Sequence, residues 1–296
     1  MSAAGMSDYA RGLLITLTGV LILSPDVLLI RLADIPEWTL MVWRGAGMAG
    51  VIGLWLILRL GRGAWAAFRS VGLAGIAIGV IYTLGNFCFL YSVNHTLAAN
   101  TLFILATMPV FSALIARFVM GLQVASRTWA TIGAVLCGIG LIAWGSAGGG
   151  QGDLLGDLAA VVTALSWAVI FTIAAKKKNL SMVPAMAIAG VVATLLALPL
   201  APQLSVPAAA LPYVTLIALV VTPGATALLS LGPRYLPAAD VALIMLLEAV
   251  LGPLLVWLVL AEFPGSWTLA GGAVVLGALA LNNLAGLRDY RRARVA

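Results

Sequence analysis

The chain has 296 residues, of which 63% are hydrophobic and only 9% are charged. Soluble domains carry about 25% charged residues, so we expect most of this chain to be surrounded by lipid instead of water. The net charge of +6 does not indicate nucleic-acid binding, because the basic residues are scattered between apolar runs and form no single patch.

Apolar runs of about 20 residues, the length that crosses a bilayer as a helix, follow one another along the sequence. Their connections are short and either polar or rich in glycine and proline, which leaves no room for a soluble domain. The predicted fold class is therefore all-α integral membrane with ten transmembrane helices. These spans are expected at residues 12–32, 38–58, 70–91, 96–119, 128–145, 154–175, 181–200, 210–230, 238–260 and 267–287.

The basic residues predict the orientation, because cytoplasmic loops carry an excess of lysine and arginine. With ten spans, fourteen of the sixteen basic residues fall on the side of both termini. We therefore expect both termini to be cytoplasmic. The fourteen are Arg11, Arg59, Arg62, Arg69, Arg117, Arg127, Lys176, Lys177, Lys178, Arg234, Arg288, Arg291, Arg292 and Arg294.

The sequence also resembles itself. AANTLFILATMP at 98–109 is similar to AADVALIMLLEA at 238–249, and GAVLCG at 133–138 to GAVVLG at 272–277. This predicts a first five-helix copy at 1–147, a linker at 148–153, and a second copy with a basic cytoplasmic tail at 154–296. Because five is odd, the second copy is inverted, as in secondary transporters that bind their substrate between the copies near the midplane. Chance similarity between Ala/Gly/Leu-rich helices is the alternative.

Two charges lie inside the first two apolar runs. Asp26 lies about 9 Å, and Arg44 about 10 Å, from the same face of the membrane, counting 1.5 Å per helical residue. A lone charge in lipid costs several kcal/mol, so we expect these two side chains to form an ion pair. The pair either fixes the packing of the first two helices or acts as a gate in a transport cycle.

Glu248 is a second acid in an apolar run, about 15 Å along the ninth span and so near the midplane. It either bonds to a neighbouring helix as a neutral acid, or carries a coupling proton, or meets a substrate amine.

Four of the prolines inside predicted spans are expected to kink them: Pro25, Pro109, Pro223 and Pro253. Proline removes a backbone hydrogen bond and frees carbonyl groups. Paired interruptions in corresponding segments are a pointer to a carrier's binding site, although kinks used only for packing are the other interpretation.

Polar and aromatic residues at similar depth are expected to line the cavity. Tyr82 and Asn86 are four residues apart and share a helix face, as are Thr163 and Trp167. For any one of these residues, hydrogen bonding between helices is the alternative. The predicted substrate-binding residues are Ser24, Tyr82, Asn86, Asn100, Thr101, Thr163, Ser166, Trp167 and Glu248. We predict no metal site, because His95 is the only histidine.

Several of these stretches resemble one known family. GDLLGDLAAVVTALSWA at 152–168, LLEAVLGP in the ninth span, ATMPVFSALIA in the fourth and VWRGAG in the second are similar to elements of the EamA-type drug/metabolite transporters. Glu248 matches the acid of that family's LLEP-like element, but Ala249 stands where proline is usual. The resemblance implies a bacterial inner-membrane carrier of small metabolites, and the YddG-like branch implies aromatic and other neutral amino acids.

The sequence therefore predicts a secondary transporter that exports such solutes by alternating access. We do not expect an enzyme, and we predict no catalytic residue and no cofactor. The expected partners are a small-molecule substrate and the lipid bilayer, and the protein can be a monomer. A drug or other metabolite carrier, working by uptake or efflux, is the alternative. A channel or a membrane-embedded enzyme is less favoured, because neither a ring of polar residues nor a catalytic cluster is visible.

Overall fold

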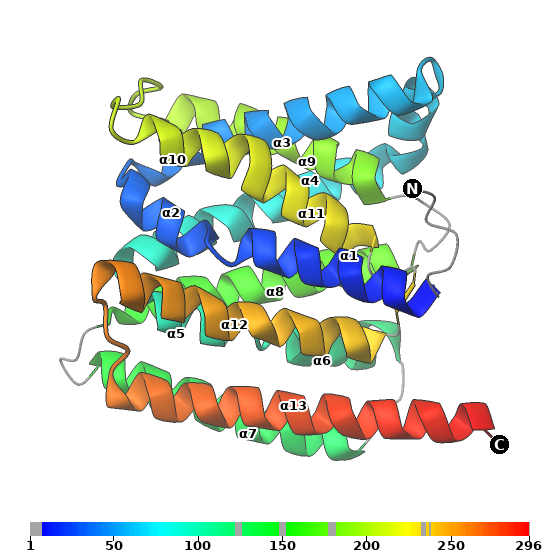
Figure 1. The fold of residues 1–296 in the computed structure, drawn as a ribbon, viewed down its shortest axis with the longest axis vertical. Coiled ribbons are helices and arrows are strands. Elements are labelled where there is room, and N and C mark those ends of the chain that lie inside the picture. Colours follow the sequence, from blue (N-terminus) through cyan, green and yellow to red (C-terminus); the bar gives the residue numbers. More distant parts are fainter. Residues whose placement is uncertain are drawn as a thin grey trace.

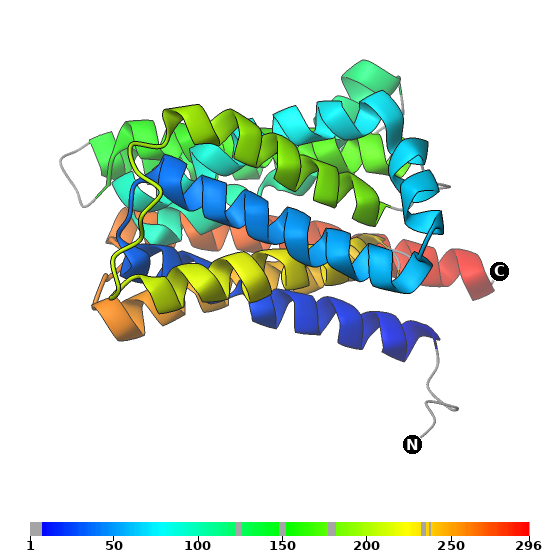
Figure 2. The same cartoon turned by 90° about the horizontal axis from the view of Figure 1, so that it is seen from above.

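The computed structural model describes residues 8–121, 126–147, 152–176, 182–231, 235–236 and 238–295. Within these ranges it contains helices and no strand. The helices lie side by side in one bundle (Figure 1), and the view from above shows them stacked in layers (Figure 2). The prediction of an all-α membrane protein is confirmed.

In the described part of the chain, nine helical segments are long and apolar enough to cross a membrane. A tenth apolar helix, Leu154–Ile170, is shorter. These segments agree with the predicted runs to within a few residues. The helices are α1 (Asp8–Leu23), α2 (Asp26–Ala33), α3 (Glu37–Leu60), α4 (Gly63–His95), α5 (Ala98–Leu105), α6 (Met108–Met120), α7 (Ser126–Ala147), α8 (Leu154–Lys176), α9 (Met182–Ala197), η1 (Leu198–Leu200), α10 (Leu211–Leu216), η2 (Ile217–Val221), α11 (Thr222–Leu231), α12 (Ala238–Leu260) and α13 (Ser266–Val295).

The two ends of the bundle differ in the chain segments that they carry. Helix α1 begins and α13 finishes at the same end (Figure 1), which we call the terminal end. The opposite end carries the turns at 34–36, 96–97 and 261–265, and we call it the tied end. The predicted linker lies outside the described residues except for 152 and 153, and Lys177, Lys178 and Arg234 also lie outside them.

Two spans are interrupted halfway. The first breaks at Ser24 and Pro25, between α1 and α2, where the Ser24 hydroxyl donates to the Val20 carbonyl at 2.8 Å. The fourth breaks at Ala106 and Thr107, two residues before Pro109. Because proline cannot donate a backbone hydrogen bond, each helix restarts beside it.

The eighth span changes its winding without stopping. Residues of η2 form a π-helical turn directly before α11, which contains Pro223 at its second position. A missing proline N–H leaves the carbonyl four residues earlier without its helical partner, and a wider turn accommodates it. Pro253 differs, because it lies inside α12 and the helix continues on both sides of it.

The third span begins earlier than its apolar run. The residues between the second and third spans were expected to be a connection, but α4 already starts at Gly63. Gly72 then bends the helix with φ 54 and ψ −146, which is a conformation that glycine adopts readily. In Figure 2 the first segment of α4 is turned across the terminal end of the bundle.

Close glycine contacts join helices that are distant in sequence. Helix α3 packs on α9, and α7 packs on α13. A Cβ atom at Gly190 would lie 2.6 Å from the Gly45 carbonyl oxygen, and one at Gly271 would lie 2.6 Å from the Gly138 carbonyl oxygen. These helices therefore approach each other backbone to backbone, as small residues allow in membranes.

We predict that Gly190→Ala destabilises the bundle, because the new methyl group meets backbone atoms of Gly45 and Ala49 that cannot move aside. Overpacking of this kind costs about 1–3 kcal/mol. The matched control is Gly53→Ala in α3, where a Cβ atom meets nothing within 4 Å. Melting temperatures in detergent should fall for the first variant alone; equal melting temperatures for both would refute the close approach of α3 and α9.

Candidate functional site

An ion pair lies in the middle of the bundle. The Arg44 Nη1 atom of α3 lies 2.8 Å and 3.0 Å from the two carboxylate oxygens of Asp26. Asp26 is 2% exposed and Arg44 4% exposed. The break at Pro25 makes Asp26 the first residue of α2, where the helix dipole and free N–H groups favour a negative charge. The structure thus brings together the two charges that the sequence placed at equal depth.

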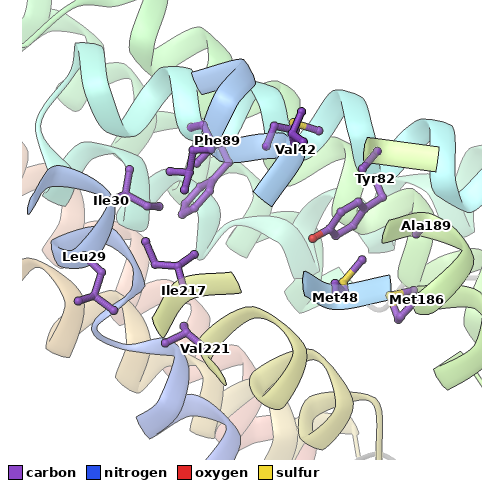
Figure 3. Close-up of a cluster of buried hydrophobic side chains, with 14 of the residues drawn as sticks. Leu29, Ile30, Val42, Met48, Tyr82, Phe89, Met186, Ala189, Ile217 and Val221 are labelled. Atoms are coloured by element: carbon purple, nitrogen blue, oxygen red, sulfur yellow. The ribbon is translucent and has the colours of Figure 1, made fainter. Parts of the chain in front are cut away.

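Aromatic side chains of α4 surround this pair. The Arg44 guanidinium lies over the Phe89 ring at 5.9 Å from its centroid. Tyr82 lies within electrostatic range of both Arg44 and Asp26. Figure 3 shows the Tyr82 and Phe89 rings projecting from α4 on the side that faces Ile217 of η2. The pair therefore has rings beside it, as a site for an amphipathic solute would need.

Tyr82 also links α4 to α8. The Asn86 amide nitrogen donates to the Tyr82 hydroxyl at 3.2 Å. The Tyr82 ring meets the edge of Trp167 at 5.5 Å between centroids. These three predicted site residues thus form one group, which is continuous with the ion pair through Tyr82.

The other predicted site residues of α8, Thr163 and Ser166, lie where α8 contacts α4. The Thr163 hydroxyl donates to the Gly85 carbonyl at 3.1 Å and to the Ala159 carbonyl at 2.9 Å. The Ser166 hydroxyl donates to Val162 in its own helix at 2.8 Å. A Cβ atom at Gly85 would lie 2.7 Å from Ser166 Cβ, so the helices touch there. In this conformation Thr163 holds α4 and α8 together.

Glu248 lies on α12, which packs against α2, the helix that begins at Asp26. Its neighbour one turn later, Gly252, is close to Leu102 and to the Ser24 carbonyl at the break of the first span. Among the described residues, Glu248 makes no ion pair or hydrogen bond. Glu248 therefore lies on a helix that borders the helix carrying Asp26.

We define the central group as Asp26, Arg44, Tyr82, Asn86, Trp167 and Glu248. It collects side chains from the helices α2, α3, α4, α8 and α12. A separate surface groove of about 550 Å³ on α10 and η2 is lined by apolar side chains with Thr215 as its polar member, and it includes no residue of the central group.

Asn100 lies in a different place, at the tied end. Its amide nitrogen donates to Asp157 of α8 at 3.0 Å, and its carbonyl oxygen accepts from Thr268 of α13 at 2.6 Å. Asp157 also accepts from Thr96 at 2.7 Å and from Ser146 at 2.6 Å. The sequence grouped Asn100 with solute-lining residues, but here its hydrogen bonds join helices.

Thr101 also makes a hydrogen bond near the tied end, since its hydroxyl lies 2.8 Å from that of Ser92.

The sequence analysis did not predict the hydrogen bonds that Asp157 accepts from Thr96, Asn100 and Ser146. A carboxylate four residues into an apolar run was the available signal, and an acid at such a position should have been expected to recruit hydroxyl and amide donors.

A second ion pair closes the tied end. Arg31 of α2 lies 3.2 Å from Glu262, which follows α12. Arg31 also donates to the Thr96 carbonyl at 2.6 Å, and Glu262 accepts from the Ala98 backbone N–H at 2.7 Å. We call Arg31 and Glu262 the clasp. The sequence did not predict the clasp, because no local pattern connects residues so far apart.

Parts of the terminal end are less completely buried. In α6, α11 and α12, consecutive side chains at 111–115, 226–231 and 243–246 are all half-buried. Helix α11 still packs on α1 there, so these runs are in contact with their neighbours but are not fully covered by them. By contrast, all residues from Ala98 to Ile104 at the tied end are buried.

Metal binding finds no support in the described residues, where no three histidine, cysteine or acidic side chains gather.

Comparison with known proteins identifies part of the chain. Residues 154–284 form a domain that matches the EamA-like transporter family. A crystal structure of another protein is similar in fold, with a TM-score of 0.67 and 17% sequence identity, and the similarity covers 94% of this chain and 98% of that one. No curated protein sequence matches the chain.

We predict that either single change, Asp26→Arg or Arg44→Asp, destabilises the protein, because each leaves like charges buried together. Breaking a buried pair costs about 3–5 kcal/mol. The double variant with both changes should recover melting temperature and detergent-extractable yield. Failure of the double variant to improve on the single variants would mean that the pair does not hold α2 against α3.

Proposed function

We propose that the chain, with its EamA-like domain at residues 154–284, is an inner-membrane secondary transporter that exports small metabolites by alternating access. The family implies a membrane drug/metabolite transporter, not an enzyme. Our proposal adds the solutes, aromatic and other neutral amino acids, and the mechanism. The observation that carries it is the central group, where a buried carboxylate–guanidinium pair lies at a break in the first span and the rings of Tyr82 and Trp167 contact each other.

The pairing of helices supports two inverted copies, at 1–147 and 154–296 with a linker at 148–153. Exchanging the copies turns the third span into the eighth and the sixth into the first. The packing of α4 on α8 then becomes the packing of α11 on α1, and both contacts are extensive. The same exchange turns α3 into α9 and α7 into α13, so the packing of α3 on α9 and of α7 on α13 is unchanged by it. Such a plan places the substrate between the copies.

The difference between the two ends supports alternating access. The tied end is closed by the clasp and by the Asp157 hydrogen bonds. At the terminal end, runs of side chains in α6, α11 and α12 are only half-buried. We infer that this conformation is open, or close to open, toward the terminal end, and that the opposite conformation requires the clasp to separate.

Charge distribution supports a cytoplasmic terminal end. Arg11, Arg59 and Arg62 lie at the ends of helices there, and the basic residues of the tail follow the apolar part of α13. Cytoplasmic loops favour such residues. With this orientation, the less completely buried end faces the cytoplasm, where an exporter collects its solute.

The chemistry of the central group supports an amphipathic solute with a ring. Tyr82, Phe89 and Trp167 supply aromatic surface, while Arg44 and Glu248 supply charges of both signs. A purely cationic drug would find two acids but also a guanidinium that repels it.

The direct test is transport of labelled L-phenylalanine in proteoliposomes. A carrier gives saturable uptake and counterflow against unlabelled L-phenylalanine. Trp167→Ala should raise the half-saturation concentration about tenfold, equal to about 1.4 kcal/mol, because it removes ring contact. The matched control is Trp129→Ala, whose side chain is 43% exposed on the bundle surface. Flux that does not saturate would indicate a channel, and no phenylalanine transport beside transport of other metabolites would refute the proposed solute.

A second prediction concerns the clasp. Arg31→Cys and Glu262→Cys are combined in a chain with Cys88→Ala and Cys137→Ala, and the new thiols are joined with a reducible bifunctional reagent. Because the clasp must separate in each cycle, joining should stop transport, and reduction should restore it. Each single-cysteine variant serves as a control for modification alone. Unchanged transport by the joined protein would show that the tied end does not open.

A further inference from the structure

Arg44 uses only part of its guanidinium group in the ion pair. Both oxygens of Asp26 accept from the same nitrogen, Nη1. Nε is buried and has no hydrogen-bond partner. Arginine presents its donors in a rigid fork, and a pair of neighbouring N–H groups matches the two oxygens of a carboxylate. Asp26 therefore occupies one corner of the fork and leaves the Nε edge free.

A buried donor without a partner is rare and costs about 1–3 kcal/mol. Burial of Arg44 is nearly complete, at 4% exposure. A side-on ion pair, in which one carboxylate oxygen accepts from Nε and the other from a neighbouring Nη, would have satisfied Nε, but both Asp26 oxygens accept from Nη1. The unused edge indicates that a further acceptor binds there during function.

The Nε edge of Arg44 lacks an acceptor, whereas Glu248 lacks a cationic partner in the part of the chain that the structure describes. Among the described residues it makes no ion pair, and its helix α12 packs against α2, which begins with the like-charged Asp26. An ionised Glu248 beside Asp26 leaves one negative charge that Arg44 does not balance. A cationic group between α12 and α2 would balance it.

We propose, on the basis of the function proposed above, that the central group binds the backbone of an α-amino acid in a fixed orientation. The substrate carboxylate accepts from the free Nε edge of Arg44, and the substrate ammonium binds Glu248. The side chain of the substrate then lies against Tyr82 and Trp167. This assigns recognition to the zwitterionic backbone, so that the ring of the substrate modulates affinity but does not define the substrate class.

The test compares four competitors of labelled L-phenylalanine uptake in proteoliposomes: L-phenylalanine, L-leucine, 2-phenylethylamine and 3-phenylpropanoate. The amine lacks the carboxylate and the acid lacks the ammonium. In the wild type, each should compete at least about tenfold more weakly than L-phenylalanine, because one buried charged group is left without its partner. L-leucine should compete within about tenfold of L-phenylalanine.

Glu248→Gln separates the two halves of the proposal. It should weaken L-phenylalanine about tenfold and leave 3-phenylpropanoate unchanged, because only the ammonium loses its partner. Arg44→Lys keeps a cation for Asp26 but removes the fork, so it should weaken L-phenylalanine and 3-phenylpropanoate and spare 2-phenylethylamine. Asp34→Asn is the control, since Asp34 is exposed at a left-handed position that asparagine also adopts. Melting temperatures establish that the variants are folded.

Two failures are distinguishable. If wild-type uptake saturates but 2-phenylethylamine competes as well as L-phenylalanine, or Glu248→Gln weakens the acid and the amino acid equally, the orientation is wrong while the transporter remains. If the wild type takes up no L-phenylalanine, the proposed solute falls and the orientation falls with it.

Discussion

The cost of charge in lipid constrains the centre of this molecule. Asp26 and Arg44 are nearly inaccessible and lie 2.8 Å apart at their closest atoms. Neither could remain in the bundle alone, because an unpaired buried ion costs several kcal/mol. The break at Pro25 presents Asp26 at the start of a new helix, where it pairs with Arg44 of α3. The guanidinium of the pair lies over the Phe89 ring of α4.

Irregular backbone collects near this pair for a related reason. Broken or widened helical turns leave carbonyl groups unpaired, and lipid offers them no hydrogen bond. Such turns are tolerated where protein covers them, and the π-helical turn η2 is packed against Gly47 of α3. The same feature gives a carrier exposed carbonyls for its substrate and joints about which half-helices move.

Much of the fold could be predicted from the sequence, because the bilayer sets the length of each apolar run. The depth of a residue follows from counting, and this is how Asp26 and Arg44 were matched. The direction of a side chain around its helix does not follow from depth when apolar residues occur on all sides. Asn100 illustrates this limit: its depth was compatible with a cavity, yet it faces Asp157 and Thr268. Partners such as Arg31 and Glu262 depend on tertiary packing that no local pattern encodes.

The proposed transport mechanism requires that a solute binds at the central group, between the two halves of the bundle. The most direct measurement is an experimental structure of the protein in a lipid nanodisc with saturating L-phenylalanine. We predict ordered density for the ligand beside Arg44, Tyr82 and Glu248, with the tied end closed below it or the terminal end closed above it. Density confined to the lipid-facing groove of α10 and η2, or a path open to both ends at once, would contradict the account.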